Sequence, residues 1–217
     1  MNIVLTGPPG AGKGTQAEMI AASYKILHIS TGDMFREAVE KGTDMGRKAG
    51  EFMKAGQLVP DDVTIGIVAE RLAQPDCEQG FLLDGFPRTI KQAEALDDIL
   101  TGLSQTLHAV INIAVPDEVL IERMTGRLTC SGCKTIYHRT FQPPQVEGVC
   151  DKCGSSLQQR GDDTAVDTAK NRLAVYKKQT NPLLEYYKQK NLLVNVNGQR
   201  SKDEVFAEIR QNLEAIQ

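Results

Sequence analysis

The 217-residue sequence lacks the features of several large protein classes. It contains no apolar run near the roughly 18–20 residues that span a bilayer. Its formal net charge is only −3, which excludes an overall positive field for nucleic acid or anionic lipid. The first residues show neither the charged start nor the apolar stretch of a signal peptide. These absences predict a cytoplasmic protein with no membrane or nucleic-acid partner, so any anion site has to be local.

Histidine is scarce, and its positions suggest no catalytic arrangement. His28 and His108 fall in strand-like runs, where we expect core or edge residues. His138 lies in a cysteine-rich segment, where a surface position is expected. No histidine is therefore assigned as a general acid or base.

What the sequence does contain is an alternation of strand-like and helix-like segments. The strand-like runs are apolar without strict alternation, as in strands covered on both faces. This order predicts an α/β fold, a doubly wound five-stranded parallel sheet that binds ligands at the carboxyl ends of its strands. The expected strands are 2–6, 27–30, 81–84, 109–115 and 192–196, and the expected helices are 13–23, 33–40, 46–55, 61–73, 89–100, 117–126, 166–189 and 202–215.

Two segments interrupt this alternation. Residues 31–59 hold two helical stretches with no strand between them, and residues 127–164 are rich in Cys, Gly and Pro with no good helix. We interpret both as mobile insertions into one core domain. That core would comprise residues 1–30, 60–126 and 165–217.

The segment GPPGAGKGT, residues 7–15, lies between the first expected strand and the first expected helix. In that context its backbone N–H groups, the helix dipole and Lys13 would all face a phosphate. Gly14 follows Lys13 where the usual pattern has Ser or Thr, and Thr15 comes one position late. We therefore expect magnesium to be held more by water and phosphate than by the protein. The loop resembles that of the nucleoside monophosphate kinases, which favours a phosphotransferase over a regulatory switch.

A phosphotransferase also needs an acceptor site with cations around the transferred group. The stretch GFLLDGFPRT predicts a buried strand that ends in Asp84 and is followed by Arg88. Asp84 matches the acidic residue that anchors hydrated magnesium, and Arg88 is placed to fork onto a phosphate. Upstream, Thr31 or Asp33 would cap the helix that carries Arg36. Alone, Asp84 would fit a helix cap and Arg88 a surface ion pair, but behind a phosphate loop the pair indicates a phosphate site.

Four of the five cysteines form two CxxC pairs separated by 16 residues, which is the spacing of a zinc site. Four sulfur ligands would close a tetrahedral site and make it structural. Two disulfides or free thiols are the alternatives, and iron or cobalt could replace zinc. Cys77 is expected to be an ordinary small residue. The predicted metal ligands are Cys130, Cys133, Cys150 and Cys153.

Together, the segments GPPGAGKGTQA, HISTGDMFR, GQLVPD and GFLLDGFPRT with Gln92, the Gly-Arg at 126–127 and QRGDD at 159–163 resemble the adenylate kinase family over the whole chain. The cysteines resemble those of the long bacterial form with a metal-bearing lid. The resemblance implies reversible transfer of the ATP γ-phosphoryl group to AMP, giving two ADP. It implies a monomer that uses Mg²⁺ with ATP and structural Zn²⁺, with an AMP-binding insertion at 31–59 and a zinc-binding lid at 127–164.

The resemblance also implies site residues. Gln92 would read the AMP adenine, Arg36 and Arg88 would bind its phosphate, and Arg123 would stack on the ATP adenine. Asp162 and Asp163 would orient lid arginines or magnesium waters. The implied catalytic residues are Lys13, Asp84, Arg88, Arg127, Arg160 and Arg172. The implied nucleotide-binding residues are Gly10, Ala11, Gly12, Lys13, Gly14, Thr15, Thr31, Arg36, Gln57, Leu58, Val59, Gly85, Phe86, Pro87, Arg88, Gln92, Arg123, Arg127, Ile136, Tyr137, Arg160, Arg172 and Gln199.

One position departs from the family pattern. Arg172 follows Asp163 by nine positions instead of eight. One extra residue turns a helix by about 100°, so the placement of Arg172 requires a compensating loop before the helix.

Three rival hypotheses remain. The first is a zinc-ribbon nucleic-acid binder on an ATPase base, against which the net acidic chain argues. The second is a regulatory switch, against which the missing hydroxyl after Lys13 argues. The third is a related kinase that phosphorylates UMP, CMP or a small alcohol. Gln92 and Thr31 favour AMP, but only through the resemblance.

Overall fold

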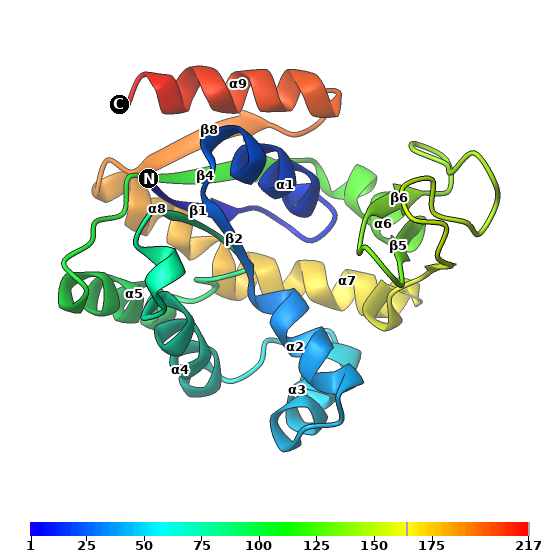
Figure 1. The fold of residues 1–217 in the computed structure, drawn as a ribbon, viewed down its shortest axis with the longest axis horizontal. Helices are drawn as coiled ribbons and strands as arrows, with labels where there is room; N and C mark the ends of the chain where they lie inside the picture. Colours follow the sequence, from blue (N-terminus) through cyan, green and yellow to red (C-terminus); the bar gives the residue numbers. More distant parts are fainter. Residues whose placement is uncertain (164, 217) are drawn as a thin grey trace.

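The computed structural model describes residues 1–163 and 165–216. Its centre is a five-stranded parallel sheet in the order β2-β3-β1-β4-β8, which confirms the predicted α/β class (Figure 1). The strands are β1 (Asn2–Thr6), β2 (Leu27–Ser30), β3 (Phe81–Asp84), β4 (Ala109–Ala114) and β8 (Leu193–Asn197). Strand order changes direction at β1, because β2 and β3 lie on one side of it and β4 and β8 on the other. Ligands bind at such switch points, beyond the carboxyl ends of the strands.

Helices cover both faces of this sheet (Figure 1). They are α1 (Lys13–Tyr24), α4 (Asp61–Leu72), α5 (Ile90–Gly102), α6 (Asp117–Thr125), α7 (Val166–Val175), α8 (Pro182–Gln189) and α9 (Lys202–Glu214). Ile3 and Leu5 of β1 pack in one apolar cluster with α1, α6, α7 and α9, whereas Val4 between them packs in a second cluster with α4, α5 and α8. Alternate side chains of a strand point to opposite faces, so a strand buried on both faces is apolar throughout. Within the described residues, no helix has the length and apolar content needed to cross a membrane.

The helix predicted over 166–189 is interrupted. Helix α7 ends at Val175, a π-helical turn follows over Tyr176–Thr180, and α8 begins at Pro182. Proline has no backbone N–H to donate, so it fits the first turn of a new helix and not the interior of a continuous one. The wide π turn lies beside the cavity described below, which Tyr176 and Thr180 help to line.

The first insertion consists of two packed helices, α2 (Thr31–Glu40) and α3 (Asp44–Lys54). They approach closely at Gly46, where a Cβ atom would lie 2.0 Å from the carbonyl oxygen of Ala38. Helix α2 begins two residues earlier than expected. Its cap is Ser30, whose Oγ accepts from the backbone N–H of Asp33 at 3.2 Å, so the prediction of Thr31 or Asp33 as the cap was wrong.

The second insertion contains a small antiparallel sheet that the sequence did not predict. Its strands are β5 (Arg127–Cys130), β6 (Ile136–His138) and β7 (Leu157–Gln158), in the order β6-β5-β7. The expected surface position of His138 was wrong, because this side chain is buried. Its Nδ1 accepts from the backbone N–H groups of Thr140 and Phe141, both at 3.0 Å, so Nε2 carries the hydrogen and donates to the carbonyl of Glu122 at 3.2 Å.

Candidate active site

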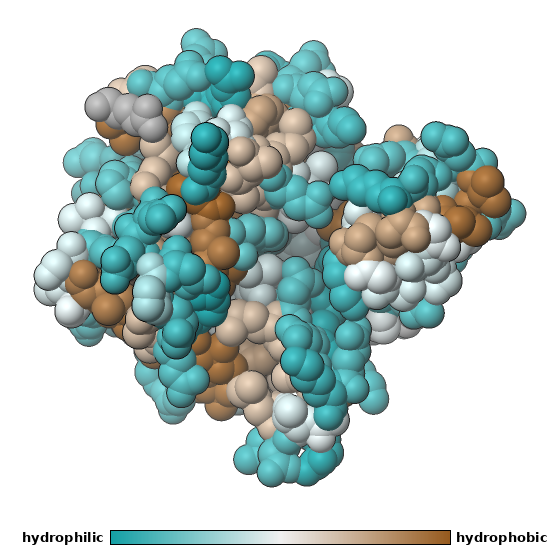
Figure 2. All heavy atoms as spheres, viewed as in Figure 1, coloured by the Kyte–Doolittle hydropathy of each residue, from teal (hydrophilic) through white to brown (hydrophobic). Residues whose placement is uncertain are grey.

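A cavity of about 1140 Å³ opens at the carboxyl ends of β1, β2 and β3, between the sheet domain and the two insertions. Figure 2 shows the molecule hollowed between the main body and two projecting lobes. Pockets for one small molecule usually measure about 300–1,000 Å³, so this cavity has room for two nucleotides. Asp84 lies level with Leu5 and Ser30 on neighbouring strands, which brings three strand ends to one edge.

The cavity gathers the residues that the resemblance implied. All of the implied nucleotide-binding and catalytic residues line it, with one exception. Phe86 is 1% exposed and packs in the apolar cluster formed with α4 and α5. Phe86 anchors the loop between β3 and α5 to this apolar cluster, while its neighbours Gly85 and Pro87 line the cavity.

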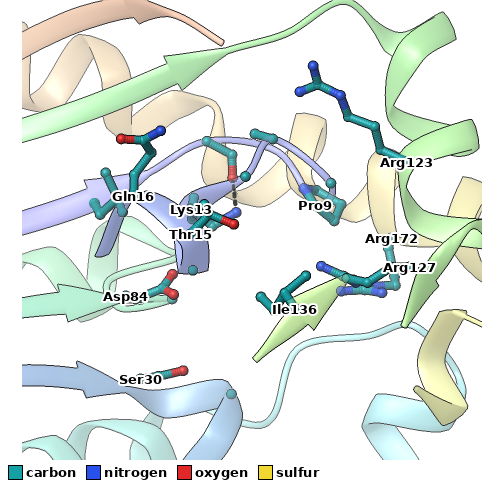
Figure 3. A pocket seen from close by; sticks show the side chains of 18 of the residues that line it. Pro9, Lys13, Thr15, Gln16, Ser30, Asp84, Arg123, Arg127, Ile136 and Arg172 are labelled. Carbon is teal, nitrogen blue, oxygen red and sulfur yellow. Dashed lines mark hydrogen bonds between the residues drawn. The ribbon is translucent and has the colours of Figure 1, made fainter. Parts of the chain in front are cut away.

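The phosphate loop connects β1 to α1. Gly12 caps α1 with φ of 93°, a left-handed conformation that favours glycine, and no side chain in the described part of the chain caps this helix. The N–H groups of the first helical turn therefore have no side-chain acceptor and are suited to an anion. Lys13 Nζ donates to the carbonyls of Gly7 at 2.7 Å and Pro8 at 2.9 Å, folding its charge back over the loop (Figure 3).

The side chain of Lys13 has a strongly shifted pKa. Burial lowers the pKa of Lys13 from its usual 10.5 to about 7. The charge of Asp84 opposes this shift, while Arg88, Arg127 and Arg172 add to it. An anion bound among these cations would favour the charged form of the lysine. The loop therefore holds a buried lysine whose charged form an anionic ligand would stabilise.

Asp84 is the carboxylate at the end of β3. Burial alone would raise the pKa of Asp84, but its interactions with His28 and Lys13 outweigh burial and hold the pKa below its usual range. The Nε2 atom of His28 lies 3.7 Å from Asp84 Oδ2. Asp84 therefore stays ionised at neutral pH, as a group that holds a hydrated divalent cation must be.

Three arginines reach the cavity from the second insertion and from α7. Arg127 forms a two-pronged pair with Asp163, with Nε to Oδ2 at 2.7 Å and Nη2 to Oδ1 at 2.9 Å. Arg172 contacts the same carboxylate and that of Asp162, so the extra residue before it does not turn it away from the site. Part of the compensating loop falls at residue 164, outside the described residues. Figure 3 shows Arg127 and Arg172 together, opposite the phosphate loop.

Arg160 and Arg36 add further positive charge. Arg160 Nε donates to Thr129 Oγ1 at 3.2 Å, and Arg36 Nη2 donates to Asp33 Oδ1 at 2.5 Å. Burial lowers the pKa of Arg160 to about 9, and repulsion from Arg127 and Arg36 contributes. Guanidinium groups crowded against one another in this way are stabilised by a bound polyanion.

The far end of the cavity is built from the loop before α9. Arg123 Nη1 donates to the carbonyl of Gly198 at 3.0 Å, beside Gln199. Gln16, which follows the phosphate loop, donates to the carbonyl of Lys202 at 2.9 Å. Arg123 therefore attaches the loop to α6, and Gln16 attaches the first residue of α9 to the helix that carries Lys13. No local sequence pattern indicates the link from Gln16, because its partner lies 186 residues away.

The four predicted metal ligands lie together in the second insertion. Their sulfur atoms are within 4.8 Å of one another, and none forms a disulfide. Cys130 and Cys153 have sulfurs 3.4 Å apart, and those of Cys133 and Cys150 are 3.6 Å apart. Sulfur atoms about 2.3 Å from a tetrahedral zinc ion would be about 3.8 Å apart. The cluster therefore fits a closed four-thiolate zinc site.

The two CxxC turns share one backbone geometry. The N–H of Cys130 donates to the carbonyl of Thr135, and the N–H of Cys150 donates to that of Ser155, both at 2.9 Å. Lys134 and Gly154, at the same place in each turn, both have positive φ, 59° and 74°. Two equivalent turns thus present two thiols each to a common centre.

Comparison with known proteins identifies the family. A sequence model of the family described as adenylate kinase matches residues 5–192. An adenylate kinase of Desulfitobacterium hafniense (strain DSM 10664 / DCB-2) is 60% identical over 96% of this chain and 96% of its own length. Adenylate kinases of Geobacillus sp. (strain WCH70) and Archaeoglobus fulgidus are 56% and 53% identical over 100% of this chain and 100% and 99% of their own lengths. The chain therefore belongs to the adenylate kinase family, and it is a nucleoside monophosphate kinase.

Proposed function

We propose that this chain catalyses the reversible, magnesium-dependent transfer of the γ-phosphoryl group of ATP to AMP, giving two ADP. The observation that carries the proposal is a single cavity in which a phosphate loop faces arginines from the first insertion, the loop after β3, the second insertion and α7. The full-length similarity to proteins named adenylate kinase supports the same reaction.

The ATP side of the cavity is assigned to the phosphate loop. Residues 10–15 would bind the phosphates, with Lys13 on the β- and γ-phosphates. Arg123 and Gln199 would lie beside the ATP base. Ile136 and Tyr137 of β6 line the cavity close to this loop, since a Cβ on Gly14 would lie 3.1 Å from Cδ1 of Ile136.

The AMP side is assigned to the first insertion and to the loop after β3. Arg36 and Arg88 would bind the AMP phosphate, and Gln92 would bind its base. Thr31 Oγ1 donates to the carbonyl of Gly85 at 2.9 Å, which joins the start of α2 to the β3 loop. The remaining residues assigned to this side are Gln57, Leu58, Val59 and Pro87.

Catalysis would rest on alignment and charge. The transition state of phosphoryl transfer is loose, with charge spread over the equatorial oxygens of the moving group. Lys13, Arg88, Arg127, Arg160 and Arg172 would surround that charge from several directions. The acceptor is a phosphate that is already anionic, so no side chain has to remove a proton from it.

Magnesium would enter with ATP. Asp84 is ionised and lies at the end of β3, and Asp162 adds a second carboxylate to the cavity wall. Both carboxylates would accept hydrogen bonds from the water molecules of a hydrated magnesium ion, because Mg²⁺ keeps several of its waters and is seldom bound by protein ligands alone. When bound, the ion neutralises phosphate charge.

The two insertions would close the site. We assign residues 31–59 as the AMP-binding insertion, residues 127–164 as the lid, and the rest as the core. An ion pair between Lys134 and Glu40, with Nζ to Oε1 at 3.3 Å, joins the two insertions. Closure over both nucleotides would exclude water, which competes with AMP as the acceptor. All of these groups come from one chain, which is consistent with a monomeric enzyme.

Zinc would have a structural role in the lid. The four thiolates leave no open position on a tetrahedral ion, and the lid's own apolar cluster is small. The metal would fix the shape of the lid while leaving the mechanism to the arginines.

A coupled assay with ATP, Mg²⁺ and a panel of monophosphates tests the proposal. We expect rapid ADP formation with AMP and weak activity with UMP, CMP and GMP. ATP hydrolysis that no monophosphate stimulates would overturn the assignment.

A further inference from the structure

We propose that Asp61 is a positioning residue that holds the amide of Gln92 in the orientation that reads adenine, and that it thereby selects AMP as the phosphoryl acceptor. The inference rests on the proposed function, because it concerns the base of the same acceptor site. Asp61 was not among the site residues predicted from the sequence.

The Gln92 side chain is held from both ends. It is 1% exposed, yet it lines the cavity. Its Nε2 donates to Asp61 Oδ1 at 2.7 Å, and its Oε1 accepts from the backbone N–H of Arg88, also at 2.7 Å. A carboxylate can only accept and a backbone N–H can only donate. A flipped amide would therefore set oxygen against oxygen and N–H against N–H, so these two partners permit one orientation.

Asp61 is itself fixed. Its Oδ1 also accepts from Thr89 Oγ1 at 3.1 Å, and the same hydroxyl caps α5 by accepting from the N–H of Gln92 at 3.2 Å. Asp61 is the first residue of α4, so this contact joins the starts of α4 and α5. Asp61 is not among the described residues that line the cavity, and it would act through Gln92 without touching a ligand.

The fixed amide has a definite recognition pattern. A glutamine amide has two N–H donors and two acceptor positions, and here one of each is already used. One N–H and one acceptor position remain for a ligand. Adenine offers its N6 amino group as a donor beside a ring nitrogen acceptor, which matches a glutamine amide. Hypoxanthine carries an oxygen in place of N6, and that oxygen would face Oε1 of Gln92 with no hydrogen between them.

The test compares AMP with IMP, which differs at the six position of the base. For wild type, Asp61→Ala and Asp61→Asn, kcat/KM is measured for each acceptor at saturating ATP–Mg. We expect the preference for AMP over IMP to fall about tenfold or more in Asp61→Ala, because a hydrogen bond to a charged group is lost, and to fall less in Asp61→Asn. The KM for ATP should stay unchanged. A structural defect alone would lower activity with both acceptors by the same factor.

Asp62→Ala is the matched control. Asp62 lies in the same first turn of α4, and its Oδ1 pairs with Lys91 Nζ at 2.6 Å on the surface. The Asp62→Ala substitution removes one negative charge from the first turn of α4, as Asp61→Ala does, but it removes no contact with Gln92. The selectivity of this variant should equal that of wild type.

A double-mutant cycle with Gln92→Met completes the test. In that background, Asp61→Ala should leave the AMP to IMP ratio unchanged, since no amide remains to be oriented. Should Asp61→Ala fail to fold, Asp61→Asn enters the cycle in its place. The proposal is overturned if wild type prefers AMP and both Asp61 variants keep that preference, or if their effect persists in Gln92→Met. Wild type that does not phosphorylate AMP would instead refute the proposed function.

Discussion

Asp163 and Arg127 form a two-pronged ion pair whose carboxylate is completely buried, with donor–acceptor distances of 2.7 and 2.9 Å. Arg172 contacts the same carboxylate. One aspartate therefore sets the direction of two of the arginines that face the phosphate loop. Asp163 therefore holds Arg127 and Arg172 in place from behind, although its own side chain is not among the described residues that line the cavity.

Asp163→Asn should weaken both stability and catalysis. The change keeps the shape of the side chain but leaves Arg127 and Arg172 without their shared counter-charge. Removing one partner of a buried ion pair costs about 3–5 kcal/mol, and we expect roughly 2–4 kcal/mol here because the arginines retain some exposure. Urea denaturation and kcat would measure the effect, with kcat expected to fall at least tenfold. Asp167→Asn, an exposed site on α7, is the control; equal losses in both variants would contradict the role of Asp163.

ATP binding should take up protons above neutral pH. Lys13 has a pKa near 7 in the ligand-free protein, below its usual 10.5, so it is mostly neutral at pH 8. A bound polyphosphate raises that pKa, and the lysine must then gain a proton. Affinity should therefore be greatest below pH 7 and decrease as the pH rises through 7 to 9. Calorimetry at pH 8 in buffers of different ionisation enthalpy would report the uptake. Equal heats in all buffers, with a flat affinity profile, would rule it out.

The lid should bind one zinc ion that stabilises the chain. Chelation or Cys133→Ala removes a four-thiolate cross-link, and a loss of roughly 3 kcal/mol would lower Tm by roughly 6–12 °C in a chain of this size. Metal analysis and thermal melting would measure both effects. Cys77→Ala, a buried cysteine outside the lid, should leave the metal content unchanged. An unchanged Tm in fully stripped protein would count against a structural metal.

The ion pair between Lys134 and Glu40 should have a small, salt-sensitive effect. Both side chains are more than half exposed, so the pair contributes about 0–1 kcal/mol. We expect Glu40→Gln to change the KM for ATP or AMP by about fivefold at most at low salt, and by less at 0.5 M salt, where exposed charges are screened. Lys41→Met is the control, because Lys41 pairs with Glu37 inside the same insertion. A salt-independent effect would show that Glu40 acts in another way.

The core of the fold was predictable because its strands are buried on both faces. In the run 81–84 the first three residues are apolar and buried before the strand ends in Asp84, and the structure places β3 at the same residues. The lid strands have two to four residues each, too few for a periodic pattern, and they surround a thiol cluster in place of a large core. The buried position of His138 was missed for the same reason. The break in the helix predicted over 166–189 was signalled by Pro182, which a continuous helix would not accommodate and which begins α8.

The candidate site was predictable in its parts but not in its pairings. The phosphate loop is local in sequence, so its glycines and Lys13 identify it directly. Asp163 lies 36 residues from Arg127, and Asp61 lies 31 residues from Gln92. No local sequence pattern predicts either contact. Phe86 stands between two cavity residues, and only packing shows that its ring belongs to the core.

Binding of a bisubstrate mimic, two adenosines joined through five phosphates, tests the central claim most directly. If one cavity aligns ATP and AMP end to end, calorimetry will show one molecule bound per chain, more tightly than either nucleotide, and displaced by ATP and by AMP. Substitution of Lys13 or Arg88 should weaken this binding strongly. A mimic that binds no more tightly than ATP, or that AMP does not displace, would contradict the account.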